Sequence, residues 1–157
     1  GGMLAVEIAK LRPASTVIII SSSKTESELK IHGGLLSRLL VKSMLLPPLY
    51  FNRTSYVVFR YLGARTKEEK QLLRQVIHDS DGRFMRWALK AVVTWQNELV
   101  PANVTHIHGT ADLTIPGKFV RPDHWIEGGT HIMIYNRGEE ISKLVAGILK
   151  DKKNIGA

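Results

Sequence analysis

An aspartate and a histidine, each following directly on a predicted strand, are the residues best placed to do chemistry. Asp112 ends the segment HGTAD at 108–112, and His131 ends GGTH at 128–131, nineteen residues further on. Catalytic groups collect at the carboxyl ends of parallel strands, which meet at one edge of a sheet. There a carboxylate can orient an imidazole, and the imidazole can take a proton from a nucleophile and return it to a leaving group. We therefore interpret the pair as the acid and the base of a catalytic triad.

The elements that must position this pair follow from hydrophobic periodicity and from turn residues. Apolar residues recur at helical spacing near both ends of the chain, and apolar or alternating runs bounded by glycine and serine indicate strands. The expected order is a helix at 3–11, strands at 16–20, 103–108 and 125–127, and a helix at 138–150. The first strand is continuously apolar, which is typical of a parallel sheet covered on both faces. The pattern therefore predicts α/β architecture.

Helices fill the interval between the first two strands. Their boundaries are marked by Gly63, which would end one helix, and by Thr66 and Glu69, which would form a capping box at the start of the next. We expect helices at 35–46, 54–62, 66–78 and 83–95. Trp87 and Trp95 are expected to belong to the core.

The acid precedes the histidine, and both follow strands in a chain of alternating helices and strands. In this order the chain resembles an α/β-hydrolase over essentially its whole length. In that family the nucleophile sits in a G-x-S-x-G elbow, between a strand and a helix and ahead of the acid and the histidine. Gly1 and Gly2 lead into the first predicted helix and are similar to the end of such an elbow. The resemblance implies a nucleophile two residues before Gly1, with the oxyanion donors also upstream. It leaves open whether the nucleophile is Ser, as in esterases and peptidases, or Asp, as in dehalogenases and epoxide hydrolases.

The resemblance also divides the chain into a hydrolase core and an inserted cap. Residues 1–23 would form the elbow helix and the first strand, 24–100 a helical cap, and 101–157 the core region with acid and histidine. The helix that usually precedes the last strand would shrink to a turn near 118–121, because the interval is short. Cap helices line the substrate pocket in this fold, and the pocket candidates are Leu39, Met44, Tyr50 and Phe51, although packing in the core explains these residues equally well. About three parallel strands are visible, and an exposed edge of such a sheet could pair with another chain.

Three features have alternative interpretations. His106 and His108 form an H-x-H that could bind zinc, but no third ligand has a suitable spacing, and packing beside the acid explains both better. The helix at 35–46 could lie on an anionic membrane surface, although its place between two strands favours a cap. The two leading glycines could be a cloning remnant before a genuine start at Met3, which would leave no elbow.

Composition limits the class of protein. The chain has 157 residues, of which 44% are hydrophobic and 23% charged, and a net charge of +8. It contains no cysteine, which excludes disulfides, thiolate metal sites and a cysteine nucleophile within these residues and fits a cytoplasmic protein. No apolar run reaches the length of a membrane span, and the basic residues are dispersed without a nucleic-acid-binding motif. We therefore expect neither a membrane span nor a nucleic-acid partner.

The functional expectation is a hydrolase. The parent protein would act on a small ester or amide-like substrate through a covalent intermediate, with serine favoured as nucleophile and with no cofactor or metal. The 157-residue chain by itself should not turn over substrate, because the nucleophile and the oxyanion donors lie outside it. The alternative is a non-catalytic binding or interaction module built on a remnant of the fold.

Overall fold

Three parallel strands form the centre of the molecule in the computed structural model, which describes residues 1–29 and 56–155. The strands are β1 (Val17–Ile20), β2 (Val104–Gly109) and β3 (His124–Ile126), in the order β1-β2-β3. β1 and β2 are in register with Val17 opposite Val104, and β3 continues the sheet on the other side of β2. The predicted α/β class is confirmed, and each strand lies within one residue of its expected position.

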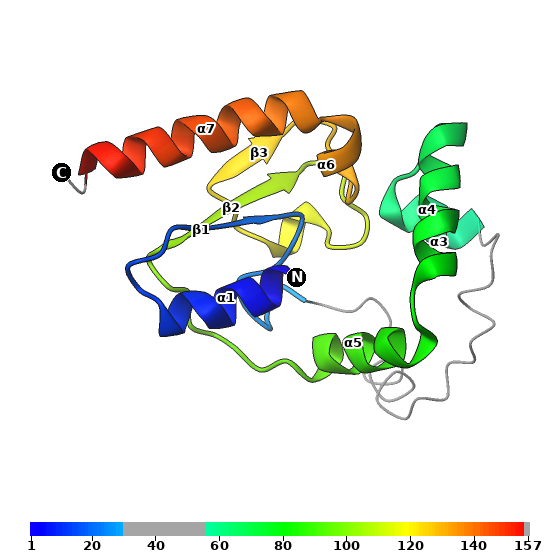
Figure 1. The fold of residues 1–157 in the computed structure, drawn as a ribbon, viewed down its shortest axis with the longest axis horizontal. Coiled ribbons are helices and arrows are strands. Elements are labelled where there is room, and N and C mark those ends of the chain that lie inside the picture. Colours follow the sequence, from blue (N-terminus) through cyan, green and yellow to red (C-terminus); the bar gives the residue numbers. More distant parts are fainter. Residues whose placement is uncertain (30–55, 156–157) are drawn as a thin grey trace.

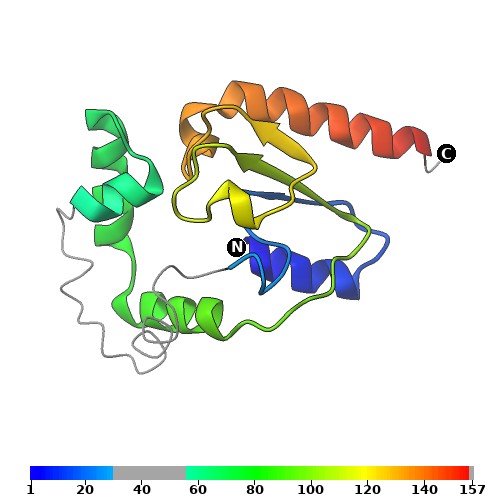
Figure 2. The same ribbon diagram turned by 180° about the vertical axis from the view of Figure 1, so that it is seen from behind.

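Helices cover both faces of the sheet, and a further group lies to one side of it (Figures 1 and 2). α1 packs on one face, α6 and α7 cover the other, and α3 to α5 lie beside the sheet. The helices are α1 (Gly2–Leu11), α3 (Tyr56–Leu62), α4 (Lys67–Asp79), α5 (Gly82–Thr94), α6 (Met133–Asn136) and α7 (Gly138–Ile155). Between β2 and β3 there is only the short 3-10 helix η2 (Gly117–Phe119), close to the reduced turn that the short interval predicts.

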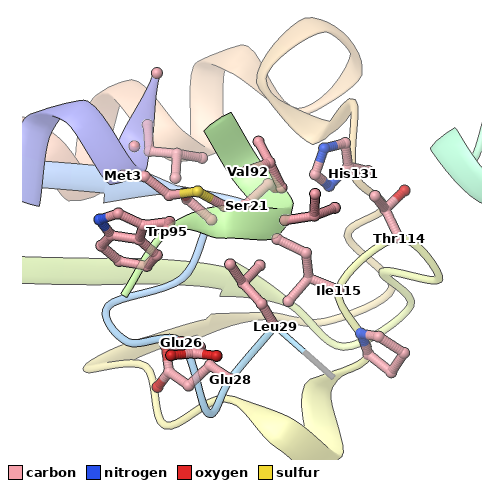
Figure 3. A pocket seen from close by; sticks show the side chains of 16 residues that line it. Met3, Ser21, Glu26, Glu28, Leu29, Val92, Trp95, Thr114, Ile115 and His131 are labelled. Carbon is pink, nitrogen blue, oxygen red and sulfur yellow. The ribbon is translucent and has the colours of Figure 1, made fainter. Parts of the chain in front are cut away.

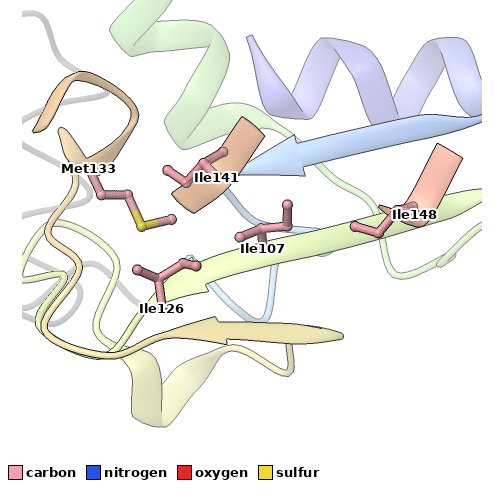
Figure 4. Close-up of a cluster of buried hydrophobic side chains, with 5 residues drawn as sticks. All are labelled: Ile107, Ile126, Met133, Ile141 and Ile148. Atoms are coloured by element: carbon pink, nitrogen blue, oxygen red, sulfur yellow. The ribbon is translucent and has the colours of Figure 1, made fainter. Parts of the chain in front are cut away.

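The alternating residues of β1 separate two hydrophobic cores, one on each face of the sheet. Ile19 is buried together with Val6 and Ala9 of α1. Its neighbours Ile18 and Ile20 pack against the cluster on the other face, under α7. Figure 4 shows the buried members of that cluster, which are Ile107, Ile126, Met133, Ile141 and Ile148. Because both faces of β1 are covered, all four of its residues are apolar.

Local signals set the boundaries of the helices beside the sheet. The backbone N–H of Glu69 donates to the Thr66 hydroxyl at 3.2 Å, and the Glu69 carboxylate accepts from the Thr66 N–H at 2.9 Å, so the predicted capping box is confirmed. Gly63 follows α3 with a φ of 82°, a conformation that other residues rarely adopt. A Cβ atom on Gly63 would also overlap the side chain of Thr130, the residue before His131. The turn between α3 and α4 is thus fitted closely against the segment that carries the histidine.

One core prediction is wrong. Trp87 is 63% exposed, and no residue of α5 is buried. Periodicity identifies residues that share a helix face, but it does not determine which face meets the rest of the molecule. Trp87 instead contacts Phe84 on the outer side of α5, with ring centroids 5.7 Å apart. Trp95, just beyond the end of α5, is half-buried and packs on the core under α1, as expected.

Several predictions fall outside the described residues. They comprise the helix at 35–46 and the four pocket candidates, Leu39, Met44, Tyr50 and Phe51. Within 1–29 and 56–155, no helix is long and apolar enough to cross a membrane.

Candidate active site

The predicted acid and histidine meet beyond the carboxyl ends of β2 and β3. Nδ1 of His131 lies 2.9 Å from Oδ2 of Asp112. Asp112 is 2% exposed, and its second oxygen, Oδ1, accepts the backbone N–H groups of Thr114 at 2.8 Å and Ile115 at 2.9 Å. A buried carboxylate that is bonded through both oxygens is held in one orientation. We refer to Asp112 and His131 as the dyad.

The partner of Nδ1 determines the tautomer of His131. An ionised carboxylate offers only acceptors, so Nδ1 carries the proton and donates it to Asp112. Nε2 then keeps its lone pair, in a side chain that is 25% exposed and lines a cavity. A neutral imidazole with one nitrogen anchored and the other available is the arrangement that a general base requires.

Two glycines allow the loops of the dyad to approach one another. A Cβ atom on Gly109, at the end of β2, would lie 2.2 Å from the carbonyl oxygen of Gly129, so the space admits only glycine. The same Gly129 carbonyl accepts a hydrogen bond from the N–H of Ala111 at 2.9 Å. Gly128, with a φ of 68°, makes the turn after β3. The backbone of the acid loop is therefore bonded directly to the loop that delivers His131.

A cavity of about 540 Å³ opens beside the dyad (Figure 3). Gly1 and Gly2 line it together with His131, so the predicted elbow remnant and the predicted base border the same space. The volume lies in the range of small-molecule pockets. Apolar side chains supply much of the wall, among them Met3, Leu29, Val92, Val93, Trp95 and Ile115.

Comparisons with protein-family models and with curated proteins found no match for this chain. The functional interpretation therefore depends on the geometry of the dyad and of the cavity.

Carboxylates line the cavity on the side away from the dyad, where Figure 3 shows Glu26 and Glu28 together. Glu28 is buried, and its two oxygens accept backbone N–H groups from Lys24 at 2.6 Å and from Arg121 at 3.3 Å. Glu28 thus ties the segment after β1 to the segment before β3. Its hydrogen bonds give it a structural role in the wall of the cavity.

Ser21 is a cavity residue that sequence reasoning missed. It follows β1 with a φ of 48°, the one non-glycine residue with positive φ in the described part of the chain. Its hydroxyl is buried and has no hydrogen-bond partner there. Strained backbone of this kind concentrates at functional sites. The available signal was a run of three serines directly after an apolar strand, which on its own indicates only a strand end.

Helices α3 and α4 are bonded to the acid loop and to α6, the helix that follows His131. The Thr114 hydroxyl, in the acid loop, donates to the carbonyl of Tyr61 at 2.8 Å. Asn136 of α6 donates to the Glu69 carboxylate at 2.6 Å. Burial alone would raise the pKa of Glu69, but hydrogen bonds from Asn136, Thr66 and Arg65 hold that pKa below its ordinary value. These contacts hold α3 and α4 against the acid loop and α6.

Two buried histidines lie behind the acid loop. His106 and His108 point to the same side of β2 and contact each other, with Nε2 of His106 3.1 Å from Nδ1 of His108. Burial, followed by the proximity of His108 and Lys24, lowers the pKa of His106 to about 3. Among residues 1–29 and 56–155, no group of three or more potential ligands could hold a metal ion. The pair has the packing and hydrogen-bonding character that its position beside the acid suggests.

Proposed function

We propose that the dyad is the acid and base of a hydrolase that cleaves small ester or amide-like substrates through a covalent intermediate. The nucleophile would lie on a segment joined to Gly1 in the parent protein. The observation that carries this proposal is the hydrogen bond of 2.9 Å between His131 and the buried Asp112, beside a cavity that Gly1 and Gly2 also line. The nitrogen that would accept the proton is the one that the hydrogen bond leaves free.

With a serine nucleophile, the steps follow from the protonation of His131. Nε2 takes the hydroxyl proton as the serine oxygen attacks the carbonyl carbon, and Asp112 stabilises the resulting imidazolium. Nε2–H then protonates the leaving alkoxide or amine, so the acyl group stays on the enzyme. Water attacks the acyl carbon in the second half and loses its proton to Nε2. The bond between the acyl carbon and the serine oxygen then breaks, Nε2–H returns its proton to that oxygen, and the carboxylic acid leaves. An aspartate nucleophile needs no deprotonation, and His131 would then activate only the water.

The most direct test uses the parent protein, with the residues that precede Gly1, and p-nitrophenyl acetate as substrate. His131→Ala removes the base and should lower kcat/KM at least about 10³-fold. Asp112→Asn should have an effect of similar size for a geometric reason. The oxygen of the amide would stay on the N–H groups of Thr114 and Ile115, and its NH₂ group would then face His131. Nδ1 would have to accept, which moves the proton to Nε2 and removes the base.

The control is His78→Ala, which alters a histidine that lies on α4 with a side chain 66% exposed. Its activity should equal that of the unchanged protein. Full hydrolysis by the His131→Ala variant would overturn the proposal. The 157-residue chain alone should release no p-nitrophenol above the rate in buffer.

A second candidate function is a non-catalytic interaction module, and one surface favours it. Leu4, Ile8 and Leu11 form a stripe along α1 and are each exposed, and β1 pairs with β2 alone among the strands of the described residues. An exposed apolar stripe and a strand edge without a neighbouring strand are each places where another polypeptide can bind. The two functions are separable, because partner binding at this surface should be unaffected by His131→Ala.

A further inference from the structure

A second chain of hydrogen bonds reaches the acid loop from inside the molecule. Nε2 of His108 lies 2.8 Å from the carbonyl oxygen of Ile115, and Nδ1 of His108 lies 3.1 Å from Nε2 of His106. Both histidines are completely buried. Ile115 is also one of the two residues whose N–H groups hold Oδ1 of Asp112. The same residue therefore donates to the acid and accepts from His108.

The acceptors in this chain determine where the protons are. A carbonyl oxygen can only accept, so Nε2 of His108 carries a proton and donates it to Ile115. In a neutral His108, Nδ1 must then be the acceptor, and Nε2 of His106 must be the donor. Nδ1 of His106 is left without a proton, and no group of the described residues lies within hydrogen-bond geometry of it, although the backbone of Ser22 approaches the His106 ring closely enough to act against the lowering of its pKa. Each imidazole is thus assigned to the Nε2–H tautomer.

This assignment matters because two imidazoles approach one carboxylate oxygen. Oδ2 of Asp112 lies 2.9 Å from Nδ1 of His131 and 3.7 Å from Nε2 of His108. A protonated His108 would compete with His131 for that oxygen. The hydrogen bond from His106 occupies the Nδ1 lone pair of His108, which is the site where a second proton would bind. The proton on Nε2 of His108 is directed to Ile115 instead of to the acid.

We propose that His108, which is hydrogen-bonded to His106 on one side and to Ile115 on the other, is a positioning residue for the acid of the dyad. By fixing the carbonyl of Ile115 it keeps the turn 112–115 closed around Oδ1, and it leaves Oδ2 to His131. The link from His108 to the turn 112–115 is argued from these hydrogen bonds alone. Its effect on turnover rests on the proposed hydrolase function. The other charged groups near the pair are Lys24 and Asp123, which lie 3.7 Å apart, and Asp123 accepts the backbone N–H of His106 at 2.7 Å.

The first measurement uses the unchanged 157-residue chain. Imidazole ¹⁵N shifts at neutral pH should show a protonated Nε2 and an unprotonated Nδ1 in both His106 and His108. Under the same conditions, His131 should show a protonated Nδ1. A His108 that carries its proton on Nδ1, or on both nitrogens, would overturn the proposal. This measurement needs neither a variant nor turnover.

The second measurement compares two variants. His108→Gln keeps an N–H donor for the Ile115 carbonyl. His108→Leu replaces the donor with an apolar side chain of comparable size. The hydrogen-bonded Nδ1–H resonance of His131 should persist in the Gln variant and be lost to exchange with water in the Leu variant. Both variants should keep the amide spectrum of the sheet, which monitors folding. An unchanged His131 resonance in His108→Leu would contradict the proposal.

Activity of the parent protein separates this proposal from the proposed function. There His108→Leu should lower kcat on the order of 10- to 100-fold with little change in KM, because the base is displaced while the cavity is kept. His108→Gln should restore most of the rate. An inactive parent protein with the expected ¹⁵N shifts would refute the hydrolase and leave the positioning role intact. An active parent whose kcat is indifferent to His108→Leu would refute the positioning role alone.

Discussion

Oδ1 and Oδ2 of Asp112 have different partners, and this difference gives the carboxylate its direction. Oδ1 is held by two backbone N–H groups of its own turn, at 2.8 and 2.9 Å. Oδ2 faces the imidazole of His131 at 2.9 Å. Rotation of the carboxylate would break hydrogen bonds at both oxygens inside a buried site, where an unpaired polar atom costs about 1–3 kcal/mol. The turn that follows β2 therefore determines the orientation of His131, because it holds the carboxylate that His131 bonds.

His106 should make stability depend on pH. Burial, with His108 and Lys24 next in effect, lowers its pKa from 6.5 to about 3 in the folded chain. Between these two values the unfolded chain binds a proton that the folded chain does not, so the free energy of unfolding falls as pH falls. The contribution is up to about 1.4 kcal/mol per pH unit for one group. Urea unfolding of the chain at several pH values below 6.5, followed by circular dichroism, measures this slope.

His106→Gln tests the assignment of that slope. Gln offers a donor for His108 but does not titrate, so the pH dependence below 6.5 should become shallower by up to about 1.4 kcal/mol per unit. His78→Gln, the same substitution at an exposed histidine of α4, is the matched control, and His106→Gln should flatten the slope more than it does. Equal slopes in His106→Gln and in the unchanged chain would show that another group is responsible.

The residues of the dyad could be predicted from the sequence, whereas their supports could not. Asp112 and His131 each follow a strand, and parallel strands bring their carboxyl ends to one edge. The role of His108 depends on the carbonyl of Ile115, and no property of an H-x-H pattern indicates a backbone partner seven residues away. Ser21 is similar, because its positive φ and its unpaired hydroxyl are properties of the tertiary structure.

At the scale of elements, the fit between the loops after β2 and β3 can be tested with a single methyl group. Gly109→Ala would place a Cβ atom 2.2 Å from the carbonyl oxygen of Gly129, so the backbone of one loop must shift. We expect a loss of at least about 2 kcal/mol in the free energy of unfolding, a typical cost of overpacking. The His131 Nδ1–H resonance should also weaken, because the two loops carry the two members of the dyad.

Gly147→Ala is the matched control for this substitution. Gly147 lies on the exposed side of α7, and a Cβ atom there meets nothing within 4 Å. Alanine in a helix interior should raise the free energy of unfolding by roughly 0.5–1 kcal/mol. Thermal and urea unfolding of the two variants should therefore move in opposite directions. A Gly109→Ala variant as stable as the unchanged chain would mean that the loops are not in close contact.

The elements themselves were largely predictable, because their signals are local. The apolar run of β1, the capping box of Thr66 and Glu69, and the glycine after α3 each indicate a boundary within a few residues. The exposure of Trp87 was not predictable in this way. It depends on where α5 lies relative to the sheet, and the helical pattern is the same whichever face turns outward.

At the scale of the whole molecule, the two cores are unequally covered. The face under α7 is packed along the sheet, and its cluster includes residues of β1, β2, β3, α6 and α7. The face under α1 is smaller, and α1 presents Leu4 and Leu11 outward with 65% and 78% of each residue exposed. In the described residues, β1 bonds to β2 on one side only. The described residues therefore present two surfaces without a partner, the apolar stripe of α1 and the outer edge of β1.

The apolar stripe of α1 should make the 157-residue chain self-associate. Burying two leucines stabilises a complex by about 1.5–3 kcal/mol each, so replacing both should weaken association at least about a hundredfold. Leu4→Lys combined with Leu11→Lys should shift the chain toward monomer in sedimentation velocity at several concentrations. Val76→Lys, at a residue 53% exposed on α4 and apart from the sheet in Figure 1, should leave association unchanged. A parent protein with the proposed upstream segment should have this stripe covered, and self-association through it should then be lost without any substitution. If Val76→Lys weakens association as much as the double variant does, the contact surface lies elsewhere. If the parent protein associates as strongly as the 157-residue chain, the upstream segment does not cover the stripe of α1. That result would favour the interaction module.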